Sequence, residues 1–220
     1  MARVVLPGEP HHITQRGIRR FNVFLDDADR HTYLNLFVEN SRRFSLRILA
    51  YCLMTNHVHF VVIPERKDSI WKTFHRCHCI YAAKFNMKHE FSGHLWQNRP
   101  FSCVLDEAHL WAAVRYVERN PVRAGMVERA EGYPWSSARA HCGTGIDRLL
   151  DPAWPPVHSI ADWSDWLLTP DQADQEQRIR ERTLTGRPCG DQAFIRTVGQ
   201  TLGRDLAPKK SGPKPNGTDI

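Results

Sequence analysis

The sequence lacks several features that would place it in a common class of protein. No apolar run approaches the roughly 18 residues that a membrane span needs. Residues 1–10 have no apolar core of the signal-peptide type. There is no glycine-rich phosphate loop, and there are no internal repeats. We therefore expect a cytoplasmic protein that neither crosses a membrane nor binds a nucleotide through such a loop.

Cysteine is present without the spacing of a cysteine-based site. The six cysteines are scattered, and none forms a Cys-x-x-Cys pair, so we expect reduced thiols. In the run from His75 to Cys79, only these two end residues share a face of a helix. No second pair at zinc-finger spacing follows, which disfavours structural zinc. The His-x-Glu and Pro-Cys-x-x-Cys signature of a zinc deaminase is also missing.

Positive charge is plentiful, and it is unevenly distributed. The net charge is +6 and the pI is about 9.1. Residues 1–150 hold 21 Lys and Arg against 14 Asp and Glu, whereas residues 151–220 hold 9 against 10. A basic surface with interleaved aromatics favours a nucleic-acid partner, through phosphate neutralisation and base stacking. An ordinary solvated basic surface remains the alternative on charge alone.

The chain predicts one α+β domain followed by an extension. The expected elements are a strand over 11–15, a helix from 26 to about 44, strands over 45–54 and 57–63, a helix over 70–87, a strand over 101–105, and a helix from 106 to Asn120-Pro121. This order predicts a ferredoxin-like split βαβ sheet with helices on one face. Strands 1 and 3 would be neighbours, bringing His11 or His12 and the basic 16–20 loop near residues 57–59.

The remainder of the chain is less regular. A short helical segment ends near residue 143, and residues 147–170 show little periodicity. Helices are expected over 172–182 and 191–202, and the lysine- and proline-rich end predicts a disordered basic tail. We therefore divide the chain into a catalytic domain over 1–146, an extension over 147–207 and a tail over 208–220. The extension would either contact DNA or cover an open edge or face of the sheet.

Two histidines on the third predicted strand are candidate metal ligands. In an extended strand, residues two apart point to the same face, so His57 and His59 lie together while Val58 points away. Two imidazoles side by side form half of a divalent-metal site. The alternative is a buried strand with two hydrogen-bonded histidines, and the spacing alone favours it.

The last predicted helix of the domain carries a candidate nucleophile. Tyr116 and Asn120 are four residues apart, which puts both on one helix face. A tyrosine can attack a phosphate and form a covalent phosphotyrosine, and an asparagine oxygen can complete a metal site. Alternatively, Tyr116 is a core residue, and Asn120 caps a new helical turn that begins at Pro121. Pro121 also weakens the same-face prediction.

Five segments, taken together, carry a specific resemblance across about the first 145 residues. They are His11-His12-Ile13-Thr14-Gln15-Arg16-Gly17, Ala50-Tyr51-Cys52-Leu53-Met54-Thr55-Asn56-His57-Val58-His59, Gly93-His94-Leu95-Trp96-Gln97, residues 116–125, and Tyr133-Pro134-Trp135-Ser136-Ser137-Ala138. In this order they resemble the REP-associated tyrosine transposases, a branch of the HUH single-tyrosine transposases of insertion sequences. One departure is Thr55, where that family commonly has proline.

The resemblance implies an HUH endonuclease fold and a role for each matching residue. His57, His59 and Asn120 would be metal ligands for Mg²⁺ or Mn²⁺, and Tyr116 would attack the DNA backbone. The implied enzyme cleaves and rejoins single-stranded, REP-like hairpin DNA through a 5′-phosphotyrosine. The alternatives are a hairpin-binding regulatory protein without catalysis and a nickase of the replication-initiator type. The sequence leaves open whether the protein is a monomer or a homodimer.

Six arginines are candidate DNA contacts. Arg16, Arg19 and Arg20 follow the first predicted strand, and Arg115, Arg119 and Arg123 flank the candidate nucleophile. For each of them, a solvated surface position is the alternative.

Overall fold

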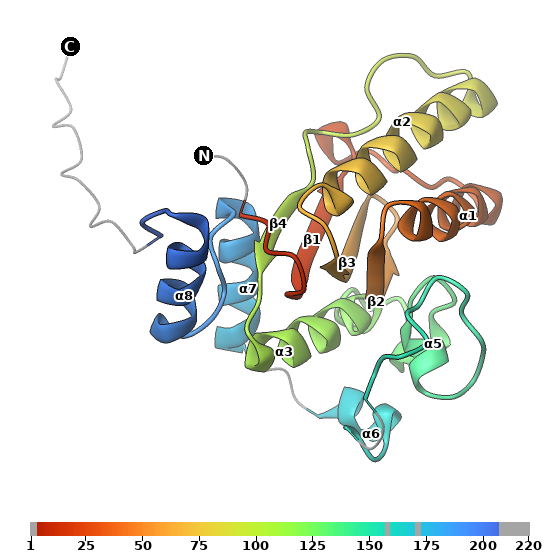
Figure 1. Ribbon diagram of the computed structural model, residues 1–220. Helices are drawn as coiled ribbons and strands as arrows, with labels where there is room; N and C mark the ends of the chain where they lie inside the picture. Colours follow the sequence, from red (N-terminus) through yellow and green to blue (C-terminus); the bar gives the residue numbers. More distant parts are fainter. Residues whose placement is uncertain (1–3, 157–158, 170–172, 207–220) are drawn as a thin grey trace, which may run out of the picture.

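The computed structural model describes residues 4–156, 159–169 and 173–206 (Figure 1). The predicted basic tail, 208–220, lies outside the described residues. The elements are β1 (His11–Arg16), η1 (Ile18–Arg20), α1 (Asp27–Arg43), β2 (Leu46–Leu53), β3 (His57–Pro64), α2 (Ser69–His89), β4 (Phe101–Val104), α3 (Glu107–Glu118), α4 (Asn120–Arg123), η2 (Ala130–Gly132), α5 (Ala138–His141), α6 (Trp163–Leu168), α7 (Ala173–Thr185) and α8 (Gln192–Leu202). Among these helices, none is long and apolar enough to cross a membrane.

The four strands form one sheet in the order β2-β3-β1-β4, and every neighbouring pair is antiparallel. This is the strand order of a split βαβ sheet, so the predicted fold class is confirmed. The predicted pairing of the first and third strands is also present. Its register sets Arg16 opposite His57 and Thr14 opposite His59.

Helices lie on both faces of the sheet, whereas the sequence predicted one face. Alternation along β3 explains how each face is used. Phe60 points toward α1 and α2, with its ring 4.7 Å from Phe37 and 5.4 Å from Phe74. His59 points the other way, toward α3, where its ring lies 5.5 Å from Tyr116. The opposite face is therefore the one that holds the candidate site (Figure 1).

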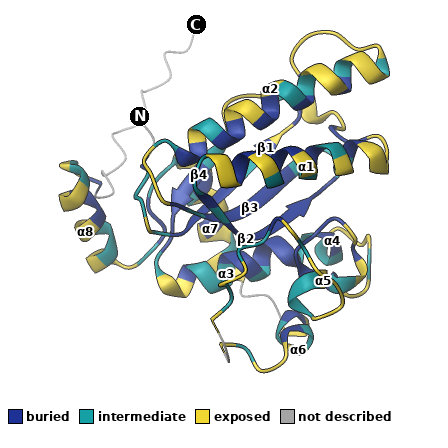
Figure 2. Cartoon of the chain, turned by 45° about the vertical axis from the view of Figure 1, so that its right-hand side comes forward, coloured by how far each residue is buried: buried dark blue, intermediate teal, exposed yellow. Residues whose placement is uncertain are grey.

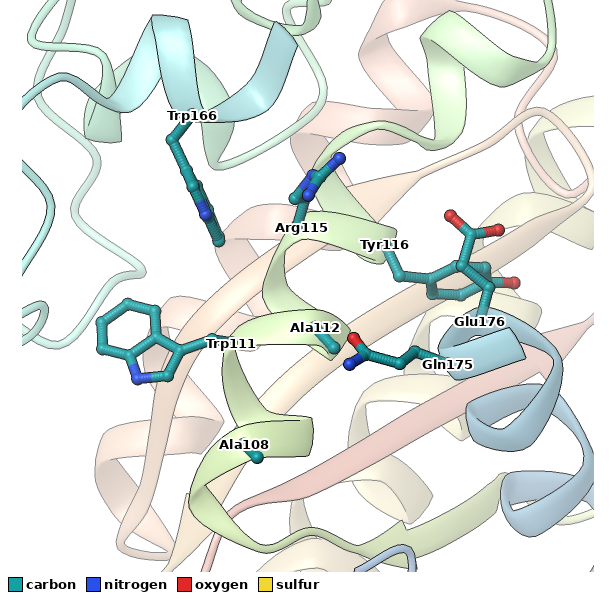
Figure 3. A pocket seen from close by; sticks show the side chains of 8 residues that line it. All are labelled: Ala108, Trp111, Ala112, Arg115, Tyr116, Trp166, Gln175 and Glu176. Atoms are coloured by element: carbon teal, nitrogen blue, oxygen red, sulfur yellow. The ribbon is translucent and has the colours of Figure 1, made fainter. Parts of the chain in front are cut away.

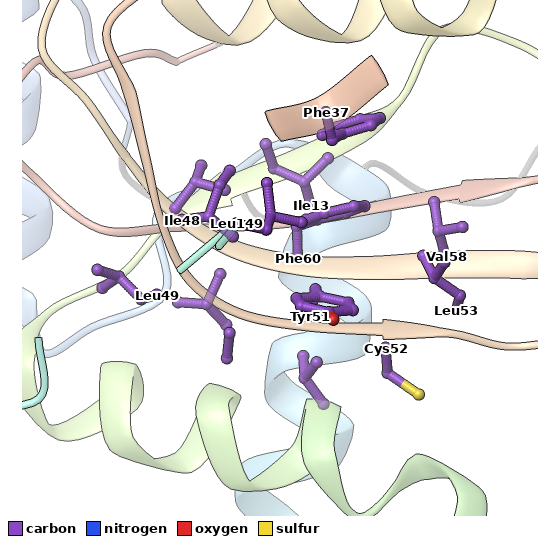
Figure 4. Close-up of a cluster of buried hydrophobic side chains, with 14 of the residues drawn as sticks. Ile13, Phe37, Ile48, Leu49, Tyr51, Cys52, Leu53, Val58, Phe60 and Leu149 are labelled. Atoms are coloured by element: carbon purple, nitrogen blue, oxygen red, sulfur yellow. The ribbon is translucent and has the colours of Figure 1, made fainter. Parts of the chain in front are cut away.

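The core fills the space between α1, α2 and the sheet. Ile13, Phe37, Val58 and Phe60 are fully buried there. The strands and the inner faces of the helices are dark in Figure 2, and Figure 4 shows these side chains close together. Burying one such side chain stabilises the fold by roughly 1.5–3 kcal/mol. A core of this kind holds β1 and β3 in fixed register, and with them every side chain on the opposite face.

Two helices of the domain begin with a capping aspartate. The Asp26 side chain accepts from the Asp29 backbone N–H, and the Asp29 side chain accepts from the Asp26 N–H, which forms a reciprocal capping box. Asp106 caps α3 by accepting from the His109 N–H. Asp68, at the N-cap position of α2, makes no side-chain cap bond. The Ser69 hydroxyl accepts from the N–H of Arg66, in the turn that precedes α2.

Residues outside the four strands cover both edges of the sheet. The backbone of Trp135 to Ser137 bonds to Tyr51 and Leu53, which covers the free edge of β2. Cys189 bonds to the backbone on the opposite edge, at Val104 and Asp106. Such covers prevent pairing of an open edge with another chain. The predicted extension thus contributes an edge cover through Cys189, and its α7 packs against β4 and α3. α6 lies in the segment where no helix was predicted.

Candidate active site

The histidine pair lies on β3 and faces α3. His57 and His59 have ring centroids 5.0 Å apart at an interplanar angle of 81°. Val58, between them, is fully buried on the other face. The predicted orientation of the three residues is therefore confirmed. His59 is 6 % exposed, and His57 is only partly covered, so the pair lies at the mouth of a cavity rather than in the core.

Hydrogen bonds leave the Nε2 atom of His57 available. Asn56 Nδ2 donates to the Arg20 carbonyl at 3.0 Å, which turns Asn56 Oδ1 toward His57. That oxygen accepts a hydrogen bond from His57 Nδ1 at 2.6 Å. The proton of the neutral imidazole is therefore on Nδ1, and Nε2 carries the lone pair.

A longer chain of hydrogen bonds leaves Nε2 of His59 available in the same way. Thr183 Oγ1 donates to the Ile179 carbonyl at 2.7 Å, so it accepts from His12 Nδ1, also at 2.7 Å. His12 Nε2 then has a lone pair, and it accepts from His59 Nδ1 at 3.0 Å. Partners of this kind orient metal-binding imidazoles and fix their tautomer. The chain begins on α7, some 120 residues from the histidine that it orients.

The three imidazoles are neutral at physiological pH. Burial, together with the smaller effect of the nearby Arg16 charge, lowers the pKa of His57 to about 4. Burial alone lowers the pKa of His12 to about 3. For His59, burial and then the surrounding histidines and arginines hold the pKa well below its usual value. Neutral imidazole is the form that binds a metal.

Tyr116 extends from α3 to the histidines. Its ring lies 5.5 Å from that of His59 and 5.7 Å from that of His12, at nearly perpendicular angles to both. Its hydroxyl oxygen accepts from Arg180 Nε at 3.2 Å. The Arg123 guanidinium lies 4.2 Å from the ring centroid. Two arginines on different helices thus hold a tyrosine that is only 6 % exposed.

α7 packs beside this tyrosine. Figure 3 shows the ring of Tyr116 next to the Glu176 carboxylate of α7. Both residues line a cavity of about 190 Å³, together with Trp111 and Trp166. Glu176 accepts from Arg123 at 2.5 Å and from Arg180 at 3.3 Å. The carboxylate therefore fixes the two arginines that contact Tyr116.

Asn120 lines the same cavity as Tyr116, although the helix between them is interrupted. α3 ends at Glu118, and α4 begins at Asn120 with Pro121 in its first turn. The backbone at Arg119 stays near helical values, with φ −83° and ψ −2°, so the four-residue spacing still places both side chains together. The buried Nδ2 atom of Asn120 has no hydrogen-bond partner in the described part of the chain. This amide is therefore not committed to a structural contact on that side.

One cavity of about 430 Å³ brings these residues together. It is lined by His57, His59, Tyr116 and Asn120, and also by His12, Thr14, Gln15, Arg16, Gln97, Phe101, Arg180, Thr183 and Leu184. Two imidazole Nε2 atoms, an amide and a phenol thus meet in a pocket that is large enough to admit a nucleotide-sized group. Such a donor set of nitrogen and oxygen atoms fits a divalent metal.

The six predicted DNA-contacting arginines fall into two groups. Arg16, Arg19 and Arg20 are exposed at the end of β1. Arg19 and Arg20 have φ of 51° and 64°, a left-handed conformation uncommon for arginine. Gly17 begins this turn, and a Cβ there would clash with the Phe21 carbonyl oxygen. The side chains of Arg19 and Arg20 are exposed to solvent in this strained turn.

The other three arginines contact the extension. Arg115 donates to the Thr169 carbonyl, and Arg119 donates to the Leu167 carbonyl. Arg123 pairs with Glu176. All three are partly buried. A DNA contact stays a prediction for each of the six, and the structure adds a second role for these three.

Four residues of the site were not identified from the sequence as functional. His12 was expected near the pair without a role, and Arg180 and Thr183 belong to a polar helix with no motif. Glu118 lies inside the segment 116–125 that carried the resemblance, but no role was derived for it. Nothing local in residues 173–185 indicates that they reach a tyrosine and a histidine from earlier in the chain.

Glu118 anchors the region behind Tyr116. It is fully buried, and it accepts from Ser137 Oγ at 2.6 Å, His141 Nδ1 at 2.6 Å and Trp163 Nε1 at 2.7 Å. These donors come from the edge-covering segment, α5 and α6. A single carboxylate on α3 thus joins three later segments to the helix that carries the tyrosine.

Comparison with known proteins identifies related sequences. Residues 10–120 match the sequence profile of the family described as "Transposase IS200 like". This range begins just before β1 and ends at Asn120, so it contains both histidines and the tyrosine. A Haemophilus influenzae protein provisionally named REP-associated tyrosine transposase is 26% identical over 144 residues. That match covers 56% of this chain and 81% of the relative.

A solved structure shows the same fold. It is described as a REP-associated tyrosine transposase bound to a REP hairpin, and it superposes with a TM-score of 0.52 at 18% sequence identity. The superposition covers 69% of this chain and 93% of the other.

Proposed function

The chain belongs to the family of IS200-like transposases, and we propose that it cleaves and rejoins single-stranded DNA at hairpins through a covalent bond to Tyr116. The resemblance found in the sequence motifs is confirmed at the level of this family. The observation that carries the proposal is the shared cavity. It brings the Tyr116 hydroxyl together with two histidines whose Nε2 atoms are free and with the amide of Asn120.

The chemistry needs no cofactor beyond a metal. Tyr116 Oη attacks the phosphorus of a phosphodiester, and the bond from phosphorus to the 3′-oxygen breaks. The phenol loses one proton and the departing oxygen gains one, so no water is consumed. A 5′-phosphotyrosine and a free 3′-hydroxyl result. Attack by the 3′-hydroxyl of another strand forms a new phosphodiester and releases the tyrosine.

Arg180 and Arg123 are placed to support this step. Arg180 Nε already donates to the phenol oxygen at 3.2 Å, and a charge-assisted hydrogen bond stabilises the phenolate as its proton leaves. Arg123 lies against the ring and is held by Glu176. We infer that these two arginines orient Tyr116 toward the histidine pair before DNA enters.

Members of this family generally use a divalent metal, and the residues present fit one. His57 and His59 would hold it through Nε2, and Asn120 would add an oxygen. When bound, the ion polarises the scissile phosphate. We propose Mg²⁺ or Mn²⁺. Mn²⁺ should bind more tightly, because it accepts imidazole ligands more readily than Mg²⁺ does.

The proposed substrate is a hairpin with single-stranded flanks. The solved relative was bound to a REP hairpin, and the exposed arginines Arg16, Arg19 and Arg20 lie beside the cavity. Their charges suit the phosphates of a folded strand.

Replacement of Tyr116 by Phe tests the proposal. Wild-type protein, Mn²⁺ and a 3′-labelled hairpin oligonucleotide should give a labelled adduct that survives denaturing electrophoresis. Tyr116→Phe should retain DNA binding and form no adduct. Tyr133→Phe is the matched control, because that hydroxyl donates to the Leu53 carbonyl outside the cavity. An adduct with Tyr116→Phe would show that the nucleophile is wrongly assigned.

The same assay tests the metal and the alternative functions. His57→Ala combined with His59→Ala, or a chelator, should abolish cleavage. Undiminished cleavage under either condition would contradict the metal site. Cleavage without joining would indicate a nickase, and binding with neither step would indicate a hairpin-binding protein without catalysis.

A further inference from the structure

Another cavity lies between α2 and the segment 93–100. We propose that it binds one unpaired base of the DNA strand that enters the catalytic cavity. We call it the α2 groove. Its volume is about 560 Å³, within the range of roughly 300–1,000 Å³ typical of small-ligand sites. Trp71, His75 and Cys79 line it from α2, and His94, Trp96 and Arg99 line it from the facing segment. The inference rests on the proposed function, because it names a further contact for the same substrate.

Flat rings dominate the walls of the groove. Trp71 and His75 stack with centroids 5.1 Å apart and an interplanar angle of 7°. His78 and Trp96 form a second stacked pair, at 4.3 Å and 20°. Trp71 is 53% exposed, so part of its ring is open to a ligand. Successive stacked rings are the platforms on which proteins bind unpaired bases.

The charge around the groove suits a strand of DNA. Arg99 lines it and makes no ion pair with any described residue. Arg19 and Arg20 lie close by, because Ile18 lines the groove and its N–H bonds to the Leu95 carbonyl at 2.9 Å. Asp68, at the start of α2, is paired with Lys72 at 2.6 Å, so its negative charge is balanced within the protein.

The groove and the catalytic cavity meet at the end of β1. They lie on opposite faces of the sheet, but Gln97 lines both of them, and its backbone N–H bonds to the carbonyl of Arg16, which lines the catalytic cavity. A strand with its scissile phosphate at Tyr116 would therefore pass around this end of the sheet, along Gln97, to place a base against Trp71. This shared residue and the unpaired positive charge favour single-stranded DNA over a protein as the occupant.

The test is a double-mutant cycle between the protein and the DNA. The probe is a DNA hairpin with thymidine extensions on both sides, in which each extension nucleotide is replaced in turn by an abasic residue. For wild-type protein, one abasic position should weaken binding between about 5-fold and 150-fold, the loss expected for one stacked base. The Trp71→Ala protein should bind the intact probe about as weakly as wild-type protein binds that abasic probe. Introducing the same abasic position should then reduce the affinity of Trp71→Ala no further.

Two variants keep this result interpretable. Trp71→Phe retains a ring, so it should recover most of the affinity and restore sensitivity to the abasic position. Met87→Ala removes another exposed apolar side chain from α2, outside the groove, and should behave as wild type. The inference is overturned if the abasic penalty is the same in wild type and Trp71→Ala at every position. It is also overturned if Trp71→Ala changes only the oligomeric state, because the groove is then a protein interface.

The covalent adduct separates this inference from the proposed function. If the adduct forms but Trp71 shows no coupling to any base, the proposed function holds and the groove is not a base-binding site. Coupling without an adduct leaves the groove as a base-binding site and removes the catalytic proposal.

Discussion

At the scale of the residue, the site depends on which nitrogen of each histidine carries its proton. His57 and His59 both have Nδ1 engaged in a hydrogen bond, and for His59 that arrangement depends on Thr183 through His12. Thr183 accepts from His12 only because its own proton goes to the Ile179 carbonyl. A single hydroxyl on α7 therefore sets the tautomer of a proposed metal ligand on β3.

Thr183→Val should weaken the metal site while leaving both histidines in place. Valine has the same shape without an acceptor, so His12 loses the partner that holds its Nδ1 proton. We expect the affinity for Mn²⁺ to fall roughly 10- to 100-fold, the usual cost of losing a partner of a metal ligand. Isothermal titration with Mn²⁺ measures this. Thr183→Ser keeps the hydroxyl and should match wild type, and equal affinity for Val and Ser would contradict the assigned chain.

At the scale of the element, α3 is the part to which most other segments attach. Tyr116 and Glu118 both lie on α3, but their side chains contact different segments. Tyr116 meets the histidines and α7, whereas Glu118 holds the edge-covering segment, α5 and α6. Repositioning of α3 would therefore move the proposed nucleophile, and the buried carboxylate opposes such movement.

Glu118→Gln should destabilise the fold measurably. The amide can accept with its oxygen, but its NH₂ group would face donors such as Trp163 Nε1, leaving buried donors unsatisfied. We expect the free energy of unfolding to fall by roughly 1–3 kcal/mol, as measured by urea denaturation. The control is Glu128→Gln, an exposed position, which should stay within about 0.5 kcal/mol of wild type. No difference between the two variants would remove the anchoring role of Glu118.

At the scale of the whole molecule, positive charge is divided between exposed arginines and arginines that contact other helices. Arg16, Arg19 and Arg20 are exposed beside the cavity. Arg115 donates to Thr169, which follows α6, Arg119 donates to Leu167 of α6, and Arg123 donates to Glu176 of α7. The net charge of +6 is therefore not a measure of how many DNA phosphates the protein can neutralise. Only contacts that release counterions enter the salt dependence of binding.

The salt dependence of hairpin binding should distinguish the two groups. Arg19→Gln and Arg20→Gln should each reduce the slope of log affinity against log salt by about 0.7–0.9, the value for one phosphate contact. Arg119→Gln should change the slope less than either of these, because its guanidinium also donates to the Leu167 carbonyl, and it should lower the thermal midpoint. Fluorescence anisotropy over a range of salt concentrations measures the slopes. Equal slope changes for Arg119 and Arg19 would show that both groups contact the DNA backbone.

Local patterns determined much of this protein. Alternation along residues 57–63 predicted that His57 and His59 point together. The strand and helix order predicted the split βαβ sheet, with His11 or His12 near the pair, and the structure places His12 there. Spacing also placed Tyr116 and Asn120 together, and the interruption at Pro121 did not separate them. These features follow from backbone periodicity and chain order, which the sequence carries directly. The roles of Tyr116, the histidines and Asn120, and the division at residue 146, stay predictions.

Tertiary structure alone decided how the site is completed. Helix α3 lies on the face opposite α1 and α2, because β3 presents histidines to one side and Phe60 to the other. Arg180 contacts Tyr116, 64 positions earlier in the sequence, and Thr183 contacts His12, 171 positions earlier. No periodicity within residues 173–185 encodes either contact. Such pairings depend on how whole elements pack around the sheet. Side chains distant in sequence meet only after the core has set the positions of their helices.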